Sequence, residues 1–252
     1  MRITWFGHSA FALEAGGRKV LVDPFLTGNP TFNAGADAAG NAARYQAALA
    51  RVTHVVLTHG HSDHVGDAAD IAIRTAPKLF CNYDLGVWLM GKIAAANGGK
   101  ETGTAFELMN TGGTVENDGV SVTLTRADHS SGALEEGVSQ ALGLPNGAII
   151  RLPGAPVVWH MGDTDVFSDM QMIDEIWKPE IVILPIGDRF TMGPASAAHA
   201  IRRYLPHARA VIPCHWGTFG LLTGTPEALK RELGSQAGLV LDFEPHVARD
   251  IA

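Results

Sequence analysis

The sequence predicts an α/β protein, of the α+β kind, that folds as a four-layer αββα sandwich of two similar halves. Two runs of strand-like segments, each accompanied by helical segments, indicate two sheets that are each covered by helices on one face. The chain has 252 residues, of which 46% are hydrophobic, and this is enough for a large core. Because no stretch has the composition of a linker, we expect residues 1–252 to form a single domain.

The first run contains short apolar segments that are typical of strands, at residues 2–6, 10–13, 19–22, 54–57 and 78–81. The Gly16-Gly17 pair predicts a hairpin turn between the second and third of these strands. Helical patterns cover residues 41–50, 68–73 and 85–96. Residues 27–40 are rich in Gly, Asn and Ala, and we expect a loop there that is long enough to suggest a functional role.

The second run begins near Phe106, and its further strands are expected at residues 120–124, 148–151, 156–160, 181–185, 210–213 and 239–243. Pro194 and the Thr225-Pro226 pair favour helix starts, and helices are expected over residues 170–177, 194–205 and 225–233. Residues 132–146 show no clear periodicity and form either a lid over a neighbouring site or an ordinary surface loop.

Composition and charge exclude several classes of protein. The formal net charge is −7 and no run of Lys or Arg occurs, which argues against a nucleic-acid partner. The two cysteines, Cys81 and Cys214, do not make a disulfide framework. No apolar segment reaches the length of a membrane span, and the first residues lack the pattern of a signal peptide. We therefore expect a cytoplasmic protein that has no membrane partner.

The chemistry is concentrated in the stretch Thr58–His64, which contains His59, His61, Asp63 and His64 within six positions. This stretch lies on a predicted loop between a strand and a helix, where functional residues are often placed. Crowded imidazoles have no mutual hydrogen-bonding solution except through water or metal, and divalent metals bind neutral imidazole and carboxylate. His59 and His61 can converge on one ion, whereas Asp63 and His64 point to a neighbouring position. Further ligands must come from later in the chain.

This His-x-His-x-Asp-His pattern resembles the signature of the metallo-β-lactamase superfamily. The stretches Trp5–Phe11 and Phe190–Pro194 are similar to those of a branch of metal-dependent hydrolases related to ascorbate-6-phosphate lactonase. The resemblance implies a metallo-β-lactamase-like fold and three more ligands, which match His129, Asp163 and His215. It also implies that Asp163 bridges two ions. One ion would be held by His59, His61 and His129, and the other by Asp63, His64 and His215.

The resemblance further implies a dinuclear metal-dependent hydrolase that uses a metal-bridging hydroxide. The expected substrate is a small anionic molecule with an ester, lactone or phosphodiester bond, because two divalent ions outweigh the negative ligands. Asp63 is the expected catalytic residue and would orient the hydroxide or carry a proton. Zinc is the first expectation for the metal, although manganese, nickel and iron also suit these ligands. Contacts with the substrate are expected from His8, Asp188, Arg189 and Thr191.

Two alternatives stay open at this point. Iron-dependent redox members of the superfamily typically replace a first-loop histidine by glutamate, so the presence of His61 favours hydrolysis. A protein that binds metal without turnover would keep the same ligands, and a screen of lactones, esters and phosphodiesters would distinguish it. The sequence also leaves open whether the chain forms a homo-oligomer.

Overall fold

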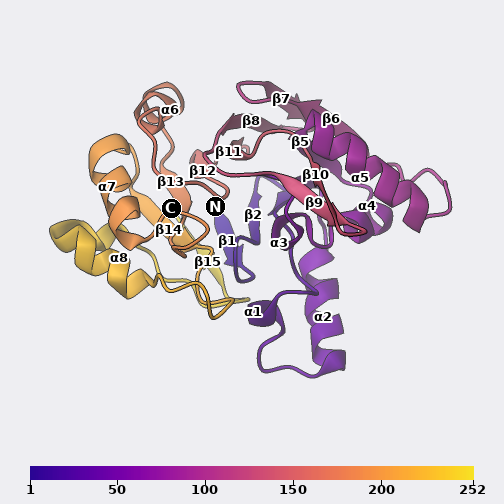
Figure 1. The fold of residues 1–252 in the computed structure, drawn as a ribbon, viewed down its shortest axis with the longest axis horizontal. Coiled ribbons are helices and arrows are strands. Elements are labelled where there is room, and N and C mark those ends of the chain that lie inside the picture. Colours follow the sequence, from indigo (N-terminus) through magenta and orange to yellow (C-terminus); the bar gives the residue numbers. More distant parts are fainter.

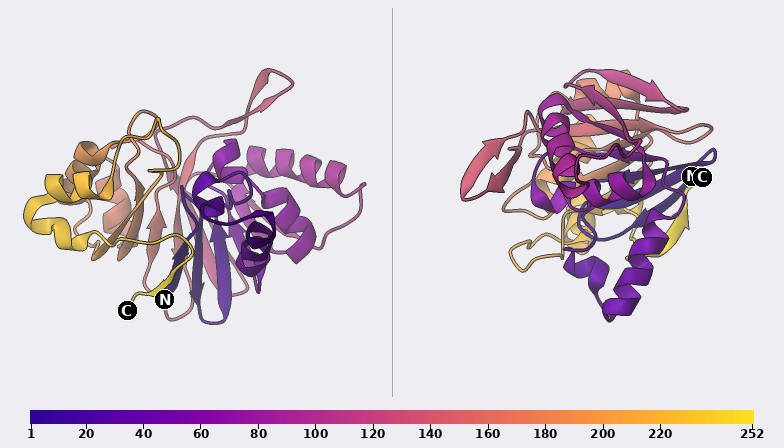
Figure 2. Two further views of the ribbon diagram at one scale, coloured as in Figure 1. Left: turned by 90° about the horizontal axis from the view of Figure 1, so that it is seen from below. Right: turned by 90° about the vertical axis from the view of Figure 1, so that its right-hand side faces the viewer.

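A computed structural model describes residues 1–252, with two β-sheets lying face to face at the centre of the molecule (Figures 1 and 2). The first sheet has seven strands in the order β15 (Ala248–Asp250), β1 (Arg2–Trp5), β2 (Phe11–Ala15), β3 (Arg18–Val22), β4 (His54–Val56), β5 (Lys78–Asn82) and β6 (Ala105–Met109). The second has six, in the order β14 (Ala210–Cys214), β13 (Ile181–Pro185), β12 (Val158–His160), β11 (Asn146–Arg151), β8 (Val120–Arg126) and β7 (Thr114–Asn117).

Helices cover the outer face of each sheet, as the left view in Figure 2 shows. The first sheet is covered by α1 (Pro30–Asn33), α2 (Ala38–Leu49), α3 (Ser62–Val65), α4 (Ala68–Thr75) and α5 (Tyr83–Ala96). The second is covered by α6 (Met170–Trp177), α7 (Pro194–Tyr204), α8 (Pro226–Leu233) and the 3₁₀ helix η1 (Gly234–Leu239). The predicted four-layer αββα sandwich is thereby confirmed. None of these helices is both long enough and apolar enough to span a bilayer.

The two sheets follow the same plan, as expected for two similar halves. Each has antiparallel neighbours on one side, β1–β2–β3 in the first sheet and β8–β11–β12 in the second. Each continues with parallel strands, from β3 to β6 and from β12 to β14. Parallel neighbours need a crossover connection, which helices supply here.

The core lies in three layers because successive strand residues face opposite sides. In β13, Ile181 and Ile183 pack into the cluster between the sheets, whereas Val182 and Leu184 pack against the helices. In β3, Val20 and Val22 face the second sheet, and Leu21 faces the first helix layer. The apolar run at residues 181–185 is therefore buried on both faces, as its sequence predicts.

Four expectations about individual segments are wrong or incomplete. Residues 27–40 contain α1 and the start of α2, because Asn29 and Asp37 cap these helices by accepting backbone N–H bonds. Residues 239–243 form no strand; β15 pairs with β1 instead, and Val240 makes only an isolated bridge. The strand near Phe106 is β6, which completes the first sheet rather than starting the second. Residues 132–146 contain a hairpin of two strands, β9 (Gly132–Glu135) and β10 (Val138–Ala141).

Candidate metal centre

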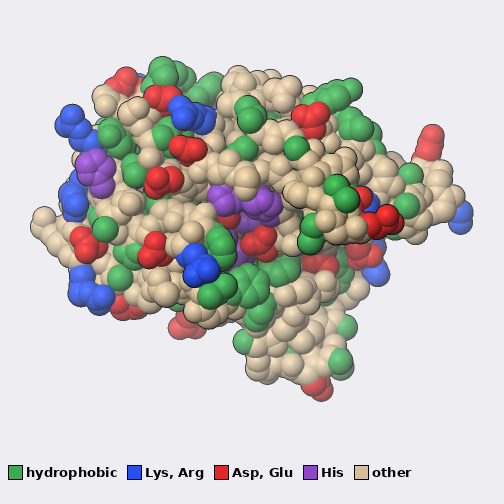
Figure 3. All heavy atoms as spheres, in the orientation of Figure 1, with side chains coloured by type: hydrophobic (Ala, Val, Ile, Leu, Met, Phe, Trp, Pro, Cys, Tyr) green, Lys and Arg blue, Asp and Glu red, His purple; other side chains and the backbone are tan.

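The predicted ligands lie at the carboxyl ends of strands, at one edge of the sandwich. The segments after β1, β3 and β4 approach this edge from the first sheet, and those after β8, β12 and β14 approach it from the second. In the space-filling view, histidine side chains gather with acidic side chains in a hollow at the centre of this face (Figure 3). Each sheet therefore supplies part of the candidate site.

Three histidines form a first cluster, which consists of His59, His61 and His129. One ring nitrogen from each lies within 4.8 Å of the others, and His59 Nε2 is 3.0 Å from His61 Nδ1. His59 and His61 follow β4, whereas His129 follows β8. Three converging neutral imidazoles are a frequent ligand set for a catalytic metal ion that keeps an open position.

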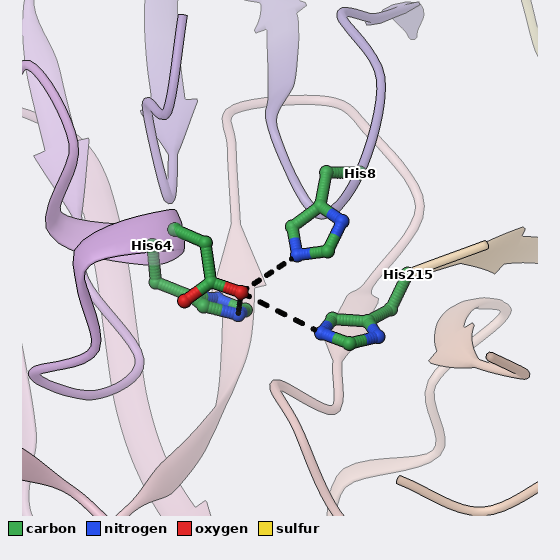
Figure 4. Close-up of side chains that lie close together, drawn as sticks. His8, His64 and His215 are labelled. Atoms are coloured by element: carbon green, nitrogen blue, oxygen red, sulfur yellow. Dashed lines mark hydrogen bonds and ion pairs between the residues drawn. The ribbon is translucent and has the colours of Figure 1, made fainter. Parts of the chain in front are cut away.

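A second cluster consists of His8, Asp63, His64 and His215, and Figure 4 shows its three histidines pointing toward one another. The Oδ2 atom of Asp63 lies at its centre. This oxygen is 2.9 Å from His8 Nε2, 3.8 Å from His215 Nε2 and 3.9 Å from His64 Nε2. These side chains come from the segment after β1, from α3 and from the segment after β14.

Asp163 joins the two clusters. Its Oδ2 atom is 2.9 Å from His215 Nε2 and 3.3 Å from His64 Nε2, both in the second cluster. The same atom is 3.7 Å from Nε2 of His129, which belongs to the first. Asp163 follows β12 and is only 2% exposed. The structure thus brings all seven predicted ligands together, while their binding of metal stays a prediction.

Two buried atoms of the site support a fit to metal ions. His64 Nε2 and Asp163 Oδ1 have no hydrogen-bond partner, and an unsatisfied buried polar group costs about 1–3 kcal/mol. An ion that accepts lone pairs from such atoms removes this cost. The nitrogen and oxygen donors suit zinc, manganese, nickel or iron.

A buried carboxylate behind the site fixes the orientation of two histidines. Asp23 accepts hydrogen bonds from the backbone N–H of Thr58 at 2.8 Å and from its hydroxyl at 2.6 Å, and its Oδ2 is 2.7 Å from His64 Nδ1. Since the Thr58 hydroxyl donates to Asp23, its oxygen accepts from His59 Nδ1, which is 3.0 Å away. Both histidines therefore use Nδ1 as the outer donor and turn Nε2 toward the centre, as metal ligands held by outer hydrogen bonds do.

The charges of the metal-free site are balanced by protons. Burial alone would lower the pKa of His64, but Asp163 and Asp23 outweigh burial and hold that pKa well above its usual value. The same competition, with Asp163 as the main carboxylate, raises the pKa of His215 to about 9. Burial would raise the pKa of Asp163, yet His64 and His215 hold it well below its usual value. A divalent ion would take the place of these histidine protons.

His8 reaches the centre through Asp63. It is completely buried, its φ of 55° lies in the left-handed region, and its Nδ1 is 3.1 Å from the Thr218 hydroxyl oxygen. The His8 carbonyl accepts hydrogen bonds from Trp5 Nε1 at 3.0 Å and from the His215 backbone N–H at 3.1 Å. His8 thus supports two predicted ligands from behind, and its contact with a substrate stays a prediction.

The other predicted substrate residues lie on a loop beside Asp163. The backbone N–H of Met192 donates to the Thr164 carbonyl at 2.9 Å and ties the loop to the segment that carries Asp163. Asp188 and Arg189 have φ values of 65° and 53°, an arrangement that is strained for residues with a side chain. Both side chains are exposed. Substrate contact stays a prediction for this set, which comprises Asp188, Arg189 and Thr191.

Sequence reasoning does not identify Asp23 or Thr58 as site residues. One signal was present, since Asp23 is a carboxylate placed directly after the apolar strand at residues 19–22. The missing information was that β3 pairs in parallel with β4, with Val22 opposite Val56. This register brings Asp23 next to the histidine loop.

Comparison with known proteins agrees with the geometry. The family model described as the beta-lactamase superfamily domain matches residues 2–215. A UPF0173 metal-dependent hydrolase of Methylobacterium nodulans is 50% identical over 228 residues, with 90% of each chain covered. One from Methylocella silvestris is 48% identical over 243 residues, with 96% of each covered. Igni18, a metallo hydrolase from the archaeon Ignicoccus hospitalis, is a solved structure with a TM-score of 0.78 and 32% identity, covering 100% of this chain and 99% of that one.

Proposed function

We propose that this chain, which belongs to the metallo-β-lactamase superfamily and within it to a family of metal-dependent hydrolases, acts with two divalent ions. The reaction proposed is hydrolysis of an ester, lactone or phosphodiester bond in a small anionic molecule. Zinc is the metal that we propose for both positions. The first ion would be held by His59, His61 and His129, the second by Asp63, His64 and His215, and both by Asp163.

The position of Asp163 carries the proposal. One carboxylate oxygen lies within 3.7 Å of ring nitrogen atoms from both histidine clusters. A carboxylate that reaches two ligand sets supports a pair of ions, an arrangement found in many hydrolytic enzymes at a separation of about 3.5–4 Å. Bound divalent ions lower the pKa of a coordinated water to about 7 and polarise the bond that is cleaved.

Among the carboxylates of the site, Asp63 is the one that a substrate can reach. Asp23 and Asp163 are buried, whereas the Asp63 side chain is 29% exposed. Asp63 is therefore the carboxylate best placed to exchange a proton with a bound substrate, and the His8 ring holds its Oδ2 in position. We propose that Asp63 orients the attacking water or carries its proton.

The charge of the loaded site favours an anionic substrate. Two divalent ions supply a charge of +4, and the two carboxylates proposed as ligands, Asp63 and Asp163, together with one hydroxide would reduce it to +1 at the face open to a substrate. This local excess would attract anions although the whole chain has a formal net charge of −7. Arg189 on the neighbouring exposed loop would add a cation that can grip a carboxylate or phosphate.

Metal stoichiometry and turnover test the proposal together. Purified protein reconstituted with zinc should contain two ions per chain by elemental analysis, and a screen of esters, lactones and phosphodiesters should reveal turnover that chelation abolishes. His59→Ala should lose at least one ion, while the control His199→Ala, which changes an exposed histidine on α7, should keep both. One ion or none in the wild-type protein would contradict the dinuclear site.

A further inference from the structure

A cavity of about 490 Å³ opens directly beside the metal centre. It lies between the histidine loop, helix α5 and the β9–β10 hairpin, and its volume is within the usual range for small-molecule sites. His61 and Asp63 are among its lining residues, and they belong to the first and the second cluster respectively. The cavity is therefore continuous with the place where a bond would be cleaved.

The hairpin that covers this cavity is held at its base. Figure 2 shows the hairpin projecting from the body of the molecule. The Ser131 hydroxyl accepts a hydrogen bond from the Gly60 backbone N–H at 3.1 Å, and its O–H donates to the Leu142 carbonyl at 3.0 Å. Asn82, which caps α5, donates to the Leu142 and Leu144 carbonyls at 3.1 Å each. These bonds fix the base of the hairpin relative to the histidine loop and to α5.

The charged groups that α5 and the hairpin add to the cavity wall neutralise each other. The Lys92 ammonium is 2.6 Å from Glu135 Oε1, and the Trp88 indole N–H donates to that same oxygen at 2.5 Å. Trp88 and Lys92 therefore share one polar partner, Glu135 on the hairpin, and the indole has no unused polar atom. The Lys92 ammonium lies over one face of this ring, 5.4 Å from its centroid. Because the ring is only partly buried, part of its remaining surface is left for apolar contacts.

The rest of the wall beyond the metal loop is apolar. Val65 is supplied by α3, and the other side chains, Ala133 and Leu134, are supplied by β9. Leu134 is 77% exposed although it is a large hydrophobic residue, and burial of its surface against a ligand would be favourable. An anionic group placed here would have to compete with Glu135 for Lys92.

We propose that this cavity, which we call the hairpin cavity, binds an uncharged apolar or aromatic substituent of the substrate, while the anionic reacting group lies at the metal centre. The inference rests on the proposed hydrolytic function and narrows it to substrates with a negative head and a neutral apolar tail. Trp88, Ala133 and Leu134 set this preference. The tail stacks on the Trp88 ring beneath the hairpin.

Calorimetric binding of phosphonates to zinc-reconstituted protein tests this preference without relying on turnover. Methylphosphonate carries only the head, 3-phenylpropylphosphonate adds a neutral tail, and a third compound carries the same tail with a carboxylate on its ring. The neutral tail should tighten binding by about 10- to 100-fold, as expected for burial of one aromatic ring, and the carboxylate should abolish most of this gain. Equal affinities for the first two compounds would overturn the proposal.

Variants assign the effect to the hairpin cavity. Trp88→Ala, and Ala133→Trp, which fills the space, should each remove the gain from the tail and leave methylphosphonate binding unchanged. The matched control Tyr83→Ala removes an aromatic ring from the same helix that does not line the cavity, and it should keep the gain. A gain that survives both Trp88→Ala and Ala133→Trp would place the tail elsewhere and overturn the proposal.

A failure of the metal centre gives a different result. If the proposed hydrolytic site is wrong, methylphosphonate should not bind at all. In that case 3-phenyl-1-propanol, which lacks the anionic head, should still bind in a manner that depends on Trp88. Absence of any Trp88-dependent binding of either tailed compound contradicts the hairpin cavity as an apolar subsite.

Discussion

Replacement of Asp23 by asparagine should weaken metal binding although Asp23 is not itself a predicted ligand. In the wild-type chain its two oxygens receive the Thr58 backbone N–H, the Thr58 hydroxyl and the Nδ1–H of His64. An amide can still accept the first of these bonds through its oxygen. Its NH₂ group, however, would face two other donors, so two buried hydrogen bonds are lost at a cost of roughly 2–4 kcal/mol.

Asp23→Asn should lower the affinity for metal by more than its loss of folding stability would explain. Without Asp23, His64 and Thr58 are free to reorient, and His59 depends on the Thr58 hydroxyl. Loss of such an outer partner typically lowers metal affinity about 10- to 100-fold. Competition with a chromogenic chelator measures this affinity, and thermal melting of the metal-free protein measures the stability.

Asp67→Asn is a matched control for Asp23→Asn. Asp67 also accepts two kinds of bond, from the backbone N–H groups of Leu26 and Thr27 and from the Thr27 hydroxyl, but it contacts no histidine. This variant should lower the melting temperature and leave metal affinity unchanged. If both variants bind zinc as tightly as the wild-type protein, the argument that Asp23 orients His64 and His59 is refuted.

Three further predictions concern the surroundings of the centre. Arg189→Ala should raise KM for an anionic substrate and leave metal content intact, and unchanged steady-state kinetics would return Arg189 to the role of a turn residue. His8→Ala removes the hydrogen-bond partner of Asp63 Oδ2 and should lower the affinity for the ion at Asp63 by about tenfold in chelator competition. Unchanged affinity would contradict the role of His8 in holding Asp63. Because the pKa of His215 is about 9 in the metal-free site, metal must displace its proton at neutral pH, so affinity should rise with pH up to about 9. Over the same window, from 6.5 to about 9, the metal-free protein should lose the stability that protonated His215 contributes, and melting curves that are flat with pH would refute this.

Local spacing explains which parts of the site are predictable from sequence. The loop after β4 and the first turn of α3 together carry four of the predicted ligands within six residues, so their proximity needs no knowledge of the fold. The continuous apolar run of β13 likewise requires burial on both faces, and that is what the structure has. Helix α8 begins where Thr225 caps it and Pro226 starts its first turn, as the sequence predicts.

Contacts between distant segments explain what the sequence does not reveal. Residues 239–243 are mostly apolar, as in a strand, yet β1 pairs with residues 248–250, so β15 takes the edge position of the first sheet. Asp23 becomes a site residue only through the parallel pairing of β3 with β4. The hairpin cavity depends on the contact of Glu135 with Trp88 and Lys92, which lie more than forty residues earlier in the chain.

The comparison of Asp163→Ala with His215→Ala tests the shared-ligand centre most directly. Asp163 is proposed to contact both ions, so its removal should impair binding at both positions together and reduce turnover by orders of magnitude. His215→Ala should mainly weaken one position. Zinc content by elemental analysis, with circular dichroism to establish folding, should therefore show a loss of up to two ions for Asp163→Ala and about one for His215→Ala. A folded Asp163→Ala protein that keeps two ions and near-normal turnover would contradict the bridge.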